Sequence, residues 1–163
     1  MKATILLFTS ILLVSFGCEK NCLPDEYNYT YDEGKGIVFT YDSTQHENNF
    51  KMQDGPFVLF QYSHLDGLCE NEIDRGWGEN LVFAIPDSLT EFNFVDSAIL
   101  QTNCYYYDDS GVHYILPVKN GVIEGNKIAN GDWSVKVDIY ARPESSYGIV
   151  ELKHIKFEGI YTK

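Results

Sequence analysis

The clearest pattern in the sequence is a strict two-residue alternation near its C-terminal end. Over residues 133–140 the apolar members are Trp133, Val135, Val137 and Ile139. Successive side chains of a β-strand point to opposite faces, so this spacing predicts a strand with one buried face. Asn130-Gly131 precedes it and is typical of a two-residue hairpin turn. The chain must therefore bury one face of a strand that belongs to a hairpin.

Strand-like runs recur along the chain at intervals of about 8–12 residues, which is typical of sandwiches and barrels. Aromatic residues make up 15% of the sequence, a composition that favours strands. Besides 133–140, the predicted strands are 37–41, 50–52, 57–63, 81–85, 91–95, 98–107, 112–118 and a last strand through Val150–Phe157. We expect an all-β, antiparallel two-sheet sandwich of about nine or ten strands. A lipocalin-like barrel is the alternative.

Two local signals refine this expectation. Asn120-Gly121 predicts a second two-residue hairpin. In the last strand the inward-facing set changes from Val150 and Leu152 to Ile155 and Phe157. A strand with a two-residue period needs one extra residue to make that change, so a β-bulge is predicted near Lys153-His154.

Residues 1–17 have the features of a secretory signal peptide. Lys2 supplies one positive charge, and a mostly apolar run follows from Ile5 to Val14. A transmembrane helix needs about 20 apolar residues, so this run is too short for a stable span. The small residues Ser15 and Gly17 precede Cys18, which predicts cleavage at the Gly17–Cys18 bond.

The segment Phe16-Gly17-Cys18-Glu19-Lys20-Asn21 resembles the loose lipobox of Bacteroidetes outer-membrane lipoproteins. The resemblance implies a diacylglyceryl anchor, with fatty acids such as palmitate, on Cys18. It also implies an outer-membrane location facing the periplasm or the cell surface. Ser15 stands where that family prefers Leu, and an ordinary signal peptidase would cut at the same bond.

The C-terminal third also resembles the ends of small lipoproteins of that group. The resemblance rests on three segments: Gly121-Val122-Ile123-Glu124-Gly125, Trp133-Ser134-Val135 and Phe157-Glu158-Gly159-Ile160-Tyr161. It implies the same location and fold class, and it implies no catalytic residue.

Removing the signal peptide leaves 146 residues, enough for one domain. We expect a tether and first edge strand at 18–35, and a single β domain at 36–163. The net charge of −12 becomes −13 because the signal contains the base Lys2 and no acid. Such acidity argues against nucleic acid and anionic lipid, whose phosphates would be repelled. The lipid on Cys18 is therefore the expected link to the membrane.

The chain contains four cysteines, Cys18, Cys22, Cys69 and Cys104. Cysteines usually pair in an oxidising compartment, and three remain if Cys18 is lipidated. The expected disulfide joins Cys69 to Cys104 across a loop of about 35 residues, worth on the order of 3–4 kcal/mol. Cys22 with either partner is the alternative. Because no cysteines or histidines have paired ligand spacing, neither a metal nor a cofactor is predicted.

Aromatic residues are the best candidates for a binding surface. Trp77 lies between Gly76 and Gly78 in an irregular stretch, and Tyr105, Tyr106 and Tyr107 are consecutive. In a strand, consecutive rings cannot all face inward. Exposed Tyr and Trp rings are typical of sugar-, peptide- and protein-binding surfaces. The alternative is that these rings pack on neighbouring strands.

Motifs for nucleophilic catalysis are absent from the sequence. It has no G-x-S-x-G, and its histidines lack the H-E-x-x-H spacing. His64 near Asp66 has the composition of a base with an orienting carboxylate, but a strand-end histidine beside a turn aspartate is the simpler interpretation. Asp108-Asp109-Ser110-Gly111 suits a hairpin turn better than a calcium loop.

Together these features predict a non-enzymatic binding or accessory module of the cell envelope, with a carbohydrate or a protein as its ligand. Two alternatives stay open at this point. One is a secreted hydrolase with an unrecognised carboxylate site, and the other is a structural subunit that assembles through edge strands.

Overall fold

The computed structural model of the protein describes residues 23–42, 47–67, 78–108, 116–141 and 152–163. In chain order the elements are β1 (Glu26–Asp42), β2 (Glu47–Leu65), β3 (Gly78–Pro86), β4 (Glu91–Val95), the 3₁₀-helix η1 (Asp96–Thr102), β5 (Tyr105–Asp108), β6 (Leu116–Lys127), β7 (Trp133–Ala141) and β8 (Lys153–Tyr161). No helix in these ranges is long and apolar enough to cross a membrane.

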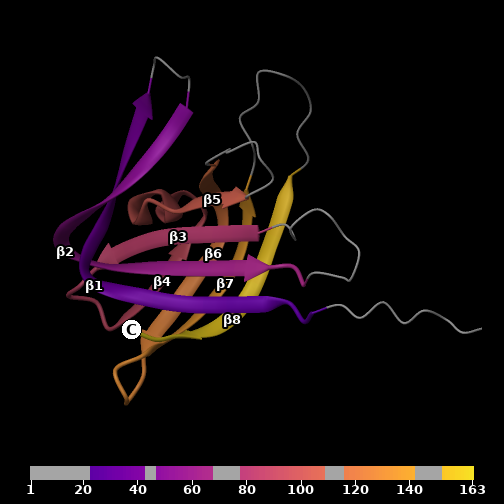
Figure 1. Cartoon of the computed structure of the whole chain (residues 1–163). Helices are drawn as coiled ribbons and strands as arrows, with labels where there is room; N and C mark the ends of the chain where they lie inside the picture. Colours follow the sequence, from indigo (N-terminus) through magenta and orange to yellow (C-terminus); the bar gives the residue numbers. More distant parts are fainter. Residues whose placement is uncertain (1–22, 43–46, 68–77, 109–115, 142–151) are drawn as a thin grey trace, which may run out of the picture.

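The strands form two antiparallel sheets of four, which cross each other in Figure 1. The first sheet has the order β1-β2-β3-β5, and the second contains β4, β6, β7 and β8. The start of β6 pairs with β5, so the sheets are joined on one side. On the other side, the described residues supply a single bridge between Thr30 and Thr162 and no continuous ladder. The predicted two-sheet sandwich is therefore confirmed, and the barrel alternative is not observed.

The described part of the chain has eight strands where about nine or ten were expected. The main reason is that the predicted strands 50–52 and 57–63 are one continuous strand, β2. Its partner β1 is similarly long and runs without interruption across position 35, where the expected tether segment ends. Beyond the register shift at Glu33/Lys35, the far part of this hairpin turns away from the sheet, as Figure 1 shows.

The predicted alternation is confirmed in β7, where Trp133, Val135, Val137 and Ile139 are all buried. Asn130-Gly131 does lie in the hairpin between β6 and β7, but that connection has five residues, 128–132, and is not the predicted two-residue turn. Trp133 meets Phe60 of β2 edge to face, with 5.4 Å between the ring centroids. Phe60 also stacks on Phe83 of β3 at 4.8 Å. The core therefore lies between the two sheets and is largely aromatic.

The predicted strand 98–107 is wrong over its first half. Residues Asp96–Thr102 form η1, in which Ile99 and Thr102 are buried, and strand structure begins only at Tyr105. A short apolar run fits a buried helical turn as well as a buried strand, so periodicity alone did not separate the two. Asn103 ends η1 in a left-handed conformation, with φ of 47°.

The hairpin predicted at Asn120-Gly121 is also wrong. Both residues lie inside β6, beside a register shift between Val118 and Asn120. Gly121 has φ of 117°, and a Cβ built there would lie 2.3 Å from the carbonyl oxygen of Asp138. The glycine therefore permits a β-bulge and a close approach of two backbones, and does not form a turn.

The β-bulge predicted near Lys153-His154 is not found. β8 pairs with β7 without a register shift from Ala141↔Lys153 to Trp133↔Tyr161. Leu152 precedes the strand and is exposed, so it was never part of an inward-facing set. Val150, the other residue behind that prediction, lies outside the described residues.

Candidate functional site

The three consecutive tyrosines of β5 pack against other residues and do not form an exposed row of rings. Tyr106 is a core residue, only 2% exposed, so it is not available to a surface ligand. Tyr105 and Tyr107 lie on the opposite face and are half-buried against a second apolar cluster. That cluster consists of Ile37, Leu59, Val82 and Ala84. Trp77, the fourth predicted ligand contact, lies outside the described residues.

Cys104 is a free thiol in this structure and is buried in the main core. Burial raises the pKa of its thiol well above the ordinary value. The predicted disulfide with Cys69 is therefore not supported. Cys69, Cys22 and the predicted lipid-bearing Cys18 lie outside the described residues.

The outer face of the second sheet, formed by β4, β6, β7 and β8, is predominantly polar. The strand registers align Asn93, Glu124, Lys136 and Glu158 in one row across the sheet, and Val95, Val122, Asp138 and Lys156 in the next. Two adjoining hollows of about 550 and 540 Å³ lie over these rows. Asn93, Glu124 and Lys136 line both hollows, so the face offers one extended groove, whose second part also has the apolar side chains of Val95 and Val122 in its lining.

Cross-strand ion pairs arrange the charges of this outer face. Lys136 Nζ donates to Glu124 Oε1 at 3.0 Å. Asp138 accepts a hydrogen bond from Lys156 at 2.6 Å and contacts His154 Nε2 at 2.8 Å. The bonds from Lys156 and His154 lower the pKa of the Asp138 carboxyl below its ordinary value. Acids and bases are therefore paired across the strands, with an excess of acids in the first hollow, where Glu91, Glu124 and Glu158 surround Lys136.

Tyr140 gives the outer face an aromatic platform at one end. Its side chain is 38% exposed and stacks on the His154 ring, with 4.5 Å between centroids and 9° between planes. Sequence reasoning did not single out Tyr140, because a lone tyrosine in an alternating strand is typical of any solvent-facing position. Only the register, which places it beside the groove and opposite His154, distinguishes it.

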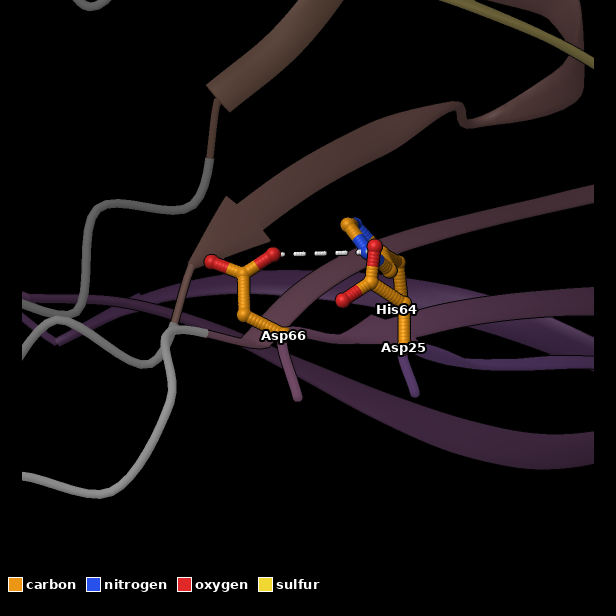
Figure 2. A group of neighbouring side chains, drawn as sticks. All are labelled: Asp25, His64 and Asp66. Atoms are coloured by element: carbon orange, nitrogen blue, oxygen red, sulfur yellow. Dashed lines mark ion pairs between the residues drawn. The ribbon is translucent and has the colours of Figure 1, made fainter. Parts of the chain in front are cut away.

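A second group of polar side chains lies in the first sheet, at the end where β1 begins and β2 ends. Asp25, His64 and Asp66 converge there (Figure 2). His64 Nε2 is 3.4 Å from Asp66 Oδ1 and 3.6 Å from Asp25 Oδ2. All three ligand-type atoms lie within 4.8 Å of one another. Asp25 directly precedes β1, while His64 lies near the end of β2 and Asp66 just beyond it.

The backbone and a neighbouring ring hold this cluster in place. Asp25 Oδ1 accepts the Gly67 amide hydrogen at 2.9 Å, while Oδ2 accepts the Tyr27 hydroxyl hydrogen at 3.4 Å and lies 3.6 Å from His64 Nε2. The hydrogen bond from Gly67 is the main reason that the pKa of the Asp25 carboxyl is lowered. Tyr27 stacks on the His64 imidazole at 4.4 Å, with its plane 1° from parallel. The ring orientation of His64 is thereby fixed.

The sequence interpretation noticed His64 and Asp66 but missed Asp25. Asp25 lies just before the first strand of a long hairpin and Asp66 just after the second strand. The register that pairs Tyr27 with His64 brings the two aspartates together. That register depends on the shift at Glu33/Lys35. Two polar residues so far apart in the sequence carry no local sign that they will meet.

Comparisons with known proteins give no assignment: no family model matches the chain, and neither a curated protein nor a solved structure is detectably similar to it.

Proposed function

We propose that this protein is exported and lipid-anchored at the cell envelope, where it acts as a non-enzymatic binding module. The ligand surface in this proposal is the outer face of β4, β6, β7 and β8. The observation that carries it is the extended groove over that face, which has charged and amide side chains along its length and the exposed Tyr140 ring at its edge. The proposal of export and anchoring rests on the leader sequence and on Cys18.

The chemistry of the outer face suits an uncharged polar ligand such as an oligosaccharide. Amide, carboxylate and ammonium groups stand side by side, so hydroxyl groups would find both donors and acceptors. An aromatic ring adds an apolar platform at low cost in conformational entropy. The acidic net charge of the whole chain, −12, disfavours polyanions. We therefore place carbohydrate ahead of protein as the ligand class.

A nuclear magnetic resonance titration tests the ligand surface. The processed protein, labelled with ¹⁵N, is titrated with soluble hexasaccharides of glucose, xylose, mannose and N-acetylglucosamine. We expect one of them to shift amides of β4, β6 and β7, with Tyr140→Ala weakening binding at least tenfold. Leu100→Ala is the control, because this exposed residue lies on η1. The absence of binding, or shifts confined to the β5 face, would contradict the proposal.

Mass spectrometry of the protein purified from its native membrane tests the anchor. The expected chain begins at Cys18 and carries the added mass of a diacylglyceryl group, while Cys18→Ser moves the protein to the soluble fraction. An uncleaved leader, or an unmodified Cys18 on membrane-bound protein, would reject this part of the proposal. The result is independent of the titration, so the anchor and the ligand surface can fail separately.

A further inference from the structure

The distances around His64 do not match hydrogen bonding. A nitrogen–oxygen hydrogen bond has a length of about 2.7–3.2 Å. His64 Nε2 is 3.4 Å from Asp66 Oδ1 and 3.6 Å from Asp25 Oδ2, so both carboxylates face it from beyond that range. In a tetrahedral site with metal–ligand bonds of about 2.0–2.1 Å, two ligand atoms lie about 3.3 Å apart. The two distances from His64 Nε2 to the aspartate oxygens are close to that value, and all three ligand-type atoms lie within 4.8 Å of one another.

His64 Nε2 is also a buried polar atom without a hydrogen bond. It is shielded from solvent, and no donor or acceptor in the described part of the chain satisfies it. Buried polar atoms are normally paired, and an orphan costs free energy unless something else fills the role. The nearest acid on the adjacent strand, Glu79, is paired with His64 in the register but is already bound to Lys153. Within the described residues, His64 Nε2 therefore faces two carboxylates and forms a hydrogen bond with neither.

From these two observations we propose that Asp25, His64 and Asp66 bind one divalent transition-metal ion, with Zn²⁺ as the expected occupant. Imidazole nitrogen with carboxylate oxygen is a typical ligand set for zinc, whereas Ca²⁺ and Mg²⁺ prefer oxygen ligands alone. Three protein ligands leave a fourth position for water. The Asp25 and Asp66 side chains are about half exposed, at 49% and 52%, so an ion can enter from solvent.

The surroundings of the cluster have the form expected around a metal site. Metal ligands are usually oriented by further contacts, which fix the ring and the free carboxylate oxygen. Tyr27 fixes the imidazole plane by stacking and donates its hydroxyl hydrogen to Asp25 Oδ2 at 3.4 Å, while the Gly67 amide holds Asp25 Oδ1. These contacts orient the carboxylate, and each carboxylate oxygen keeps a second lone pair that can bind the ion. A bound ion would join the segment before β1 to the end of β2. The site would then stabilise the first sheet from the end nearest the predicted tether.

The competing interpretation is a protonated His64 that forms ion pairs with both aspartates and binds no metal. Isothermal titration calorimetry of the untagged, metal-free chain with ZnCl₂ at pH 7.5 separates the two. We expect one site per chain that His64→Gln removes, and that Asp25→Asn and Asp66→Asn each weaken at least tenfold. Excess Ca²⁺ or Mg²⁺ should leave Zn²⁺ binding unchanged.

The matched control is His154→Gln. His154 also contacts a carboxylate, that of Asp138, but at the hydrogen-bonding distance of 2.8 Å and with Lys156 on the other carboxylate oxygen. This variant should bind Zn²⁺ like the wild type. Equal Zn²⁺ binding by wild type and His64→Gln would overturn the proposal, because any ion would then sit elsewhere, for example on cysteines. No binding by the wild type would also overturn it.

A second readout covers the case in which a variant fails to fold. In wild-type protein, ¹⁵N resonances of the His64 ring report directly on Nε2, which should shift on Zn²⁺ addition while the His154 ring stays unchanged. An unchanged His64 ring would reject the site without any substitution. This proposal does not depend on the outer face of the second sheet, so oligosaccharide binding and Zn²⁺ binding can succeed or fail independently.

Discussion

Phe60 is the residue at which the two sheets meet. Its side chain is fully buried and lies beside rings contributed by five other strands. These rings are Tyr31 of β1, Phe83 of β3, Phe92 of β4, Trp133 of β7 and Tyr161 of β8. Aromatic pairs in stacked or edge-to-face geometry each add about 0.5–1.5 kcal/mol beyond the burial of their area. A single ring on β2 therefore links both halves of the sandwich.

We predict that Phe60→Ala lowers the free energy of unfolding by about 3–5 kcal/mol, because it leaves a cavity among five rings. Phe60→Leu should cost less, since it keeps most of the apolar volume. Urea unfolding followed by tryptophan fluorescence measures both. Leu100→Ala, at a position 48% exposed, is the control and should change stability by no more than about 0.5 kcal/mol. A Phe60→Ala protein as stable as that control would show that the ring is not central.

Single residues divide into those that local pattern predicts and those that it does not. The inward face of β7 followed from alternation alone, because the two-residue period is a direct consequence of strand geometry. The burial of Tyr106 and the half-burial of its two neighbours depended on which strands cover β5. The contact between Asp25 and His64 depended on a hairpin register. Neither this contact nor the burial of the three tyrosines could be predicted from local sequence.

At the scale of elements, the bulge in β6 is linked by a hydrogen bond to the start of η1. The Gly121 amide donates to Asp96 Oδ1 at 3.0 Å, which ties β6 to the first residue of η1. Asp96 itself has a positive φ of 49°, an uncommon conformation for a residue other than glycine. The bulge and the start of η1 therefore support each other.

Two glycines with positive φ allow the bulge to be tested by comparison. Gly34 has φ of 76° and open space where a Cβ would be, so Gly34→Ala should cost about 1–2 kcal/mol of conformational strain. Gly121→Ala adds a clash with the Asp138 backbone to a similar strain and should cost clearly more. Thermal unfolding of the two variants gives the order. Equal losses would mean that β7 moves aside easily at this point.

Glu33 connects β1 to the second sheet through two lysines. Its carboxylate accepts hydrogen bonds from Lys163 at 2.7 Å and from Lys127 at 3.1 Å. These bonds lower the pKa of the Glu33 carboxyl below its ordinary value of 4.5. Folding therefore favours the ionised form. The stability gained is fully present above pH 4.5 and is lost as the pH falls through the lower pKa of the folded protein.

Glu33→Gln should consequently lower stability at neutral pH and make little difference at strongly acidic pH. The neutral-pH loss should stay below about 1 kcal/mol, because the side chain is 41% exposed and the pairs are screened by solvent. Urea midpoints at several pH values measure it. Glu91→Gln, on an exposed part of β4, is the control. A loss that does not shrink in acid would assign the effect to packing.

Elements were predicted best where strands are long and regular, and least well at their ends. The apolar residues around Ile99 are too few to distinguish a helical turn from a strand. Asn120-Gly121 has the composition of a hairpin turn, yet the same positive φ also serves a bulge. In both cases the structure was decided by the contact between η1 and β6. Local sequence does not show that these two elements will meet.

For the whole molecule, the two sheets share one core, are joined by a ladder on one side and are linked by a single bridge on the other. Beside the β5–β6 ladder, the Tyr31 amide donates to the Thr162 carbonyl at 3.0 Å, and the Thr162 amide donates to the Tyr29 carbonyl at 3.2 Å. Tyr31 also donates its hydroxyl hydrogen to the Gly131 carbonyl at 2.9 Å. Contacts between opposite ends of the chain therefore bind the sandwich into a single unit.

We predict that urea unfolds the protein in one cooperative transition. Near-ultraviolet circular dichroism, which reports the aromatic core, and far-ultraviolet dichroism, which reports the strands, should give the same midpoint. A first transition seen by only one probe would show that one sheet survives without the other. The fold class needed only the strand spacing, whereas the joining of the sheets required the three-dimensional positions of Tyr31 and Thr162.

Because Cys104 is buried, the reactivity of its thiol can report transient opening of the folded protein. A thiol that is 2% exposed and has a raised pKa supplies almost no reactive thiolate while the sandwich stays shut. If the other three cysteines are replaced by serine, a thiol-specific dye can modify this sulfur only after the two sheets separate and expose it. The speed of colour development then reports how often that happens under native conditions.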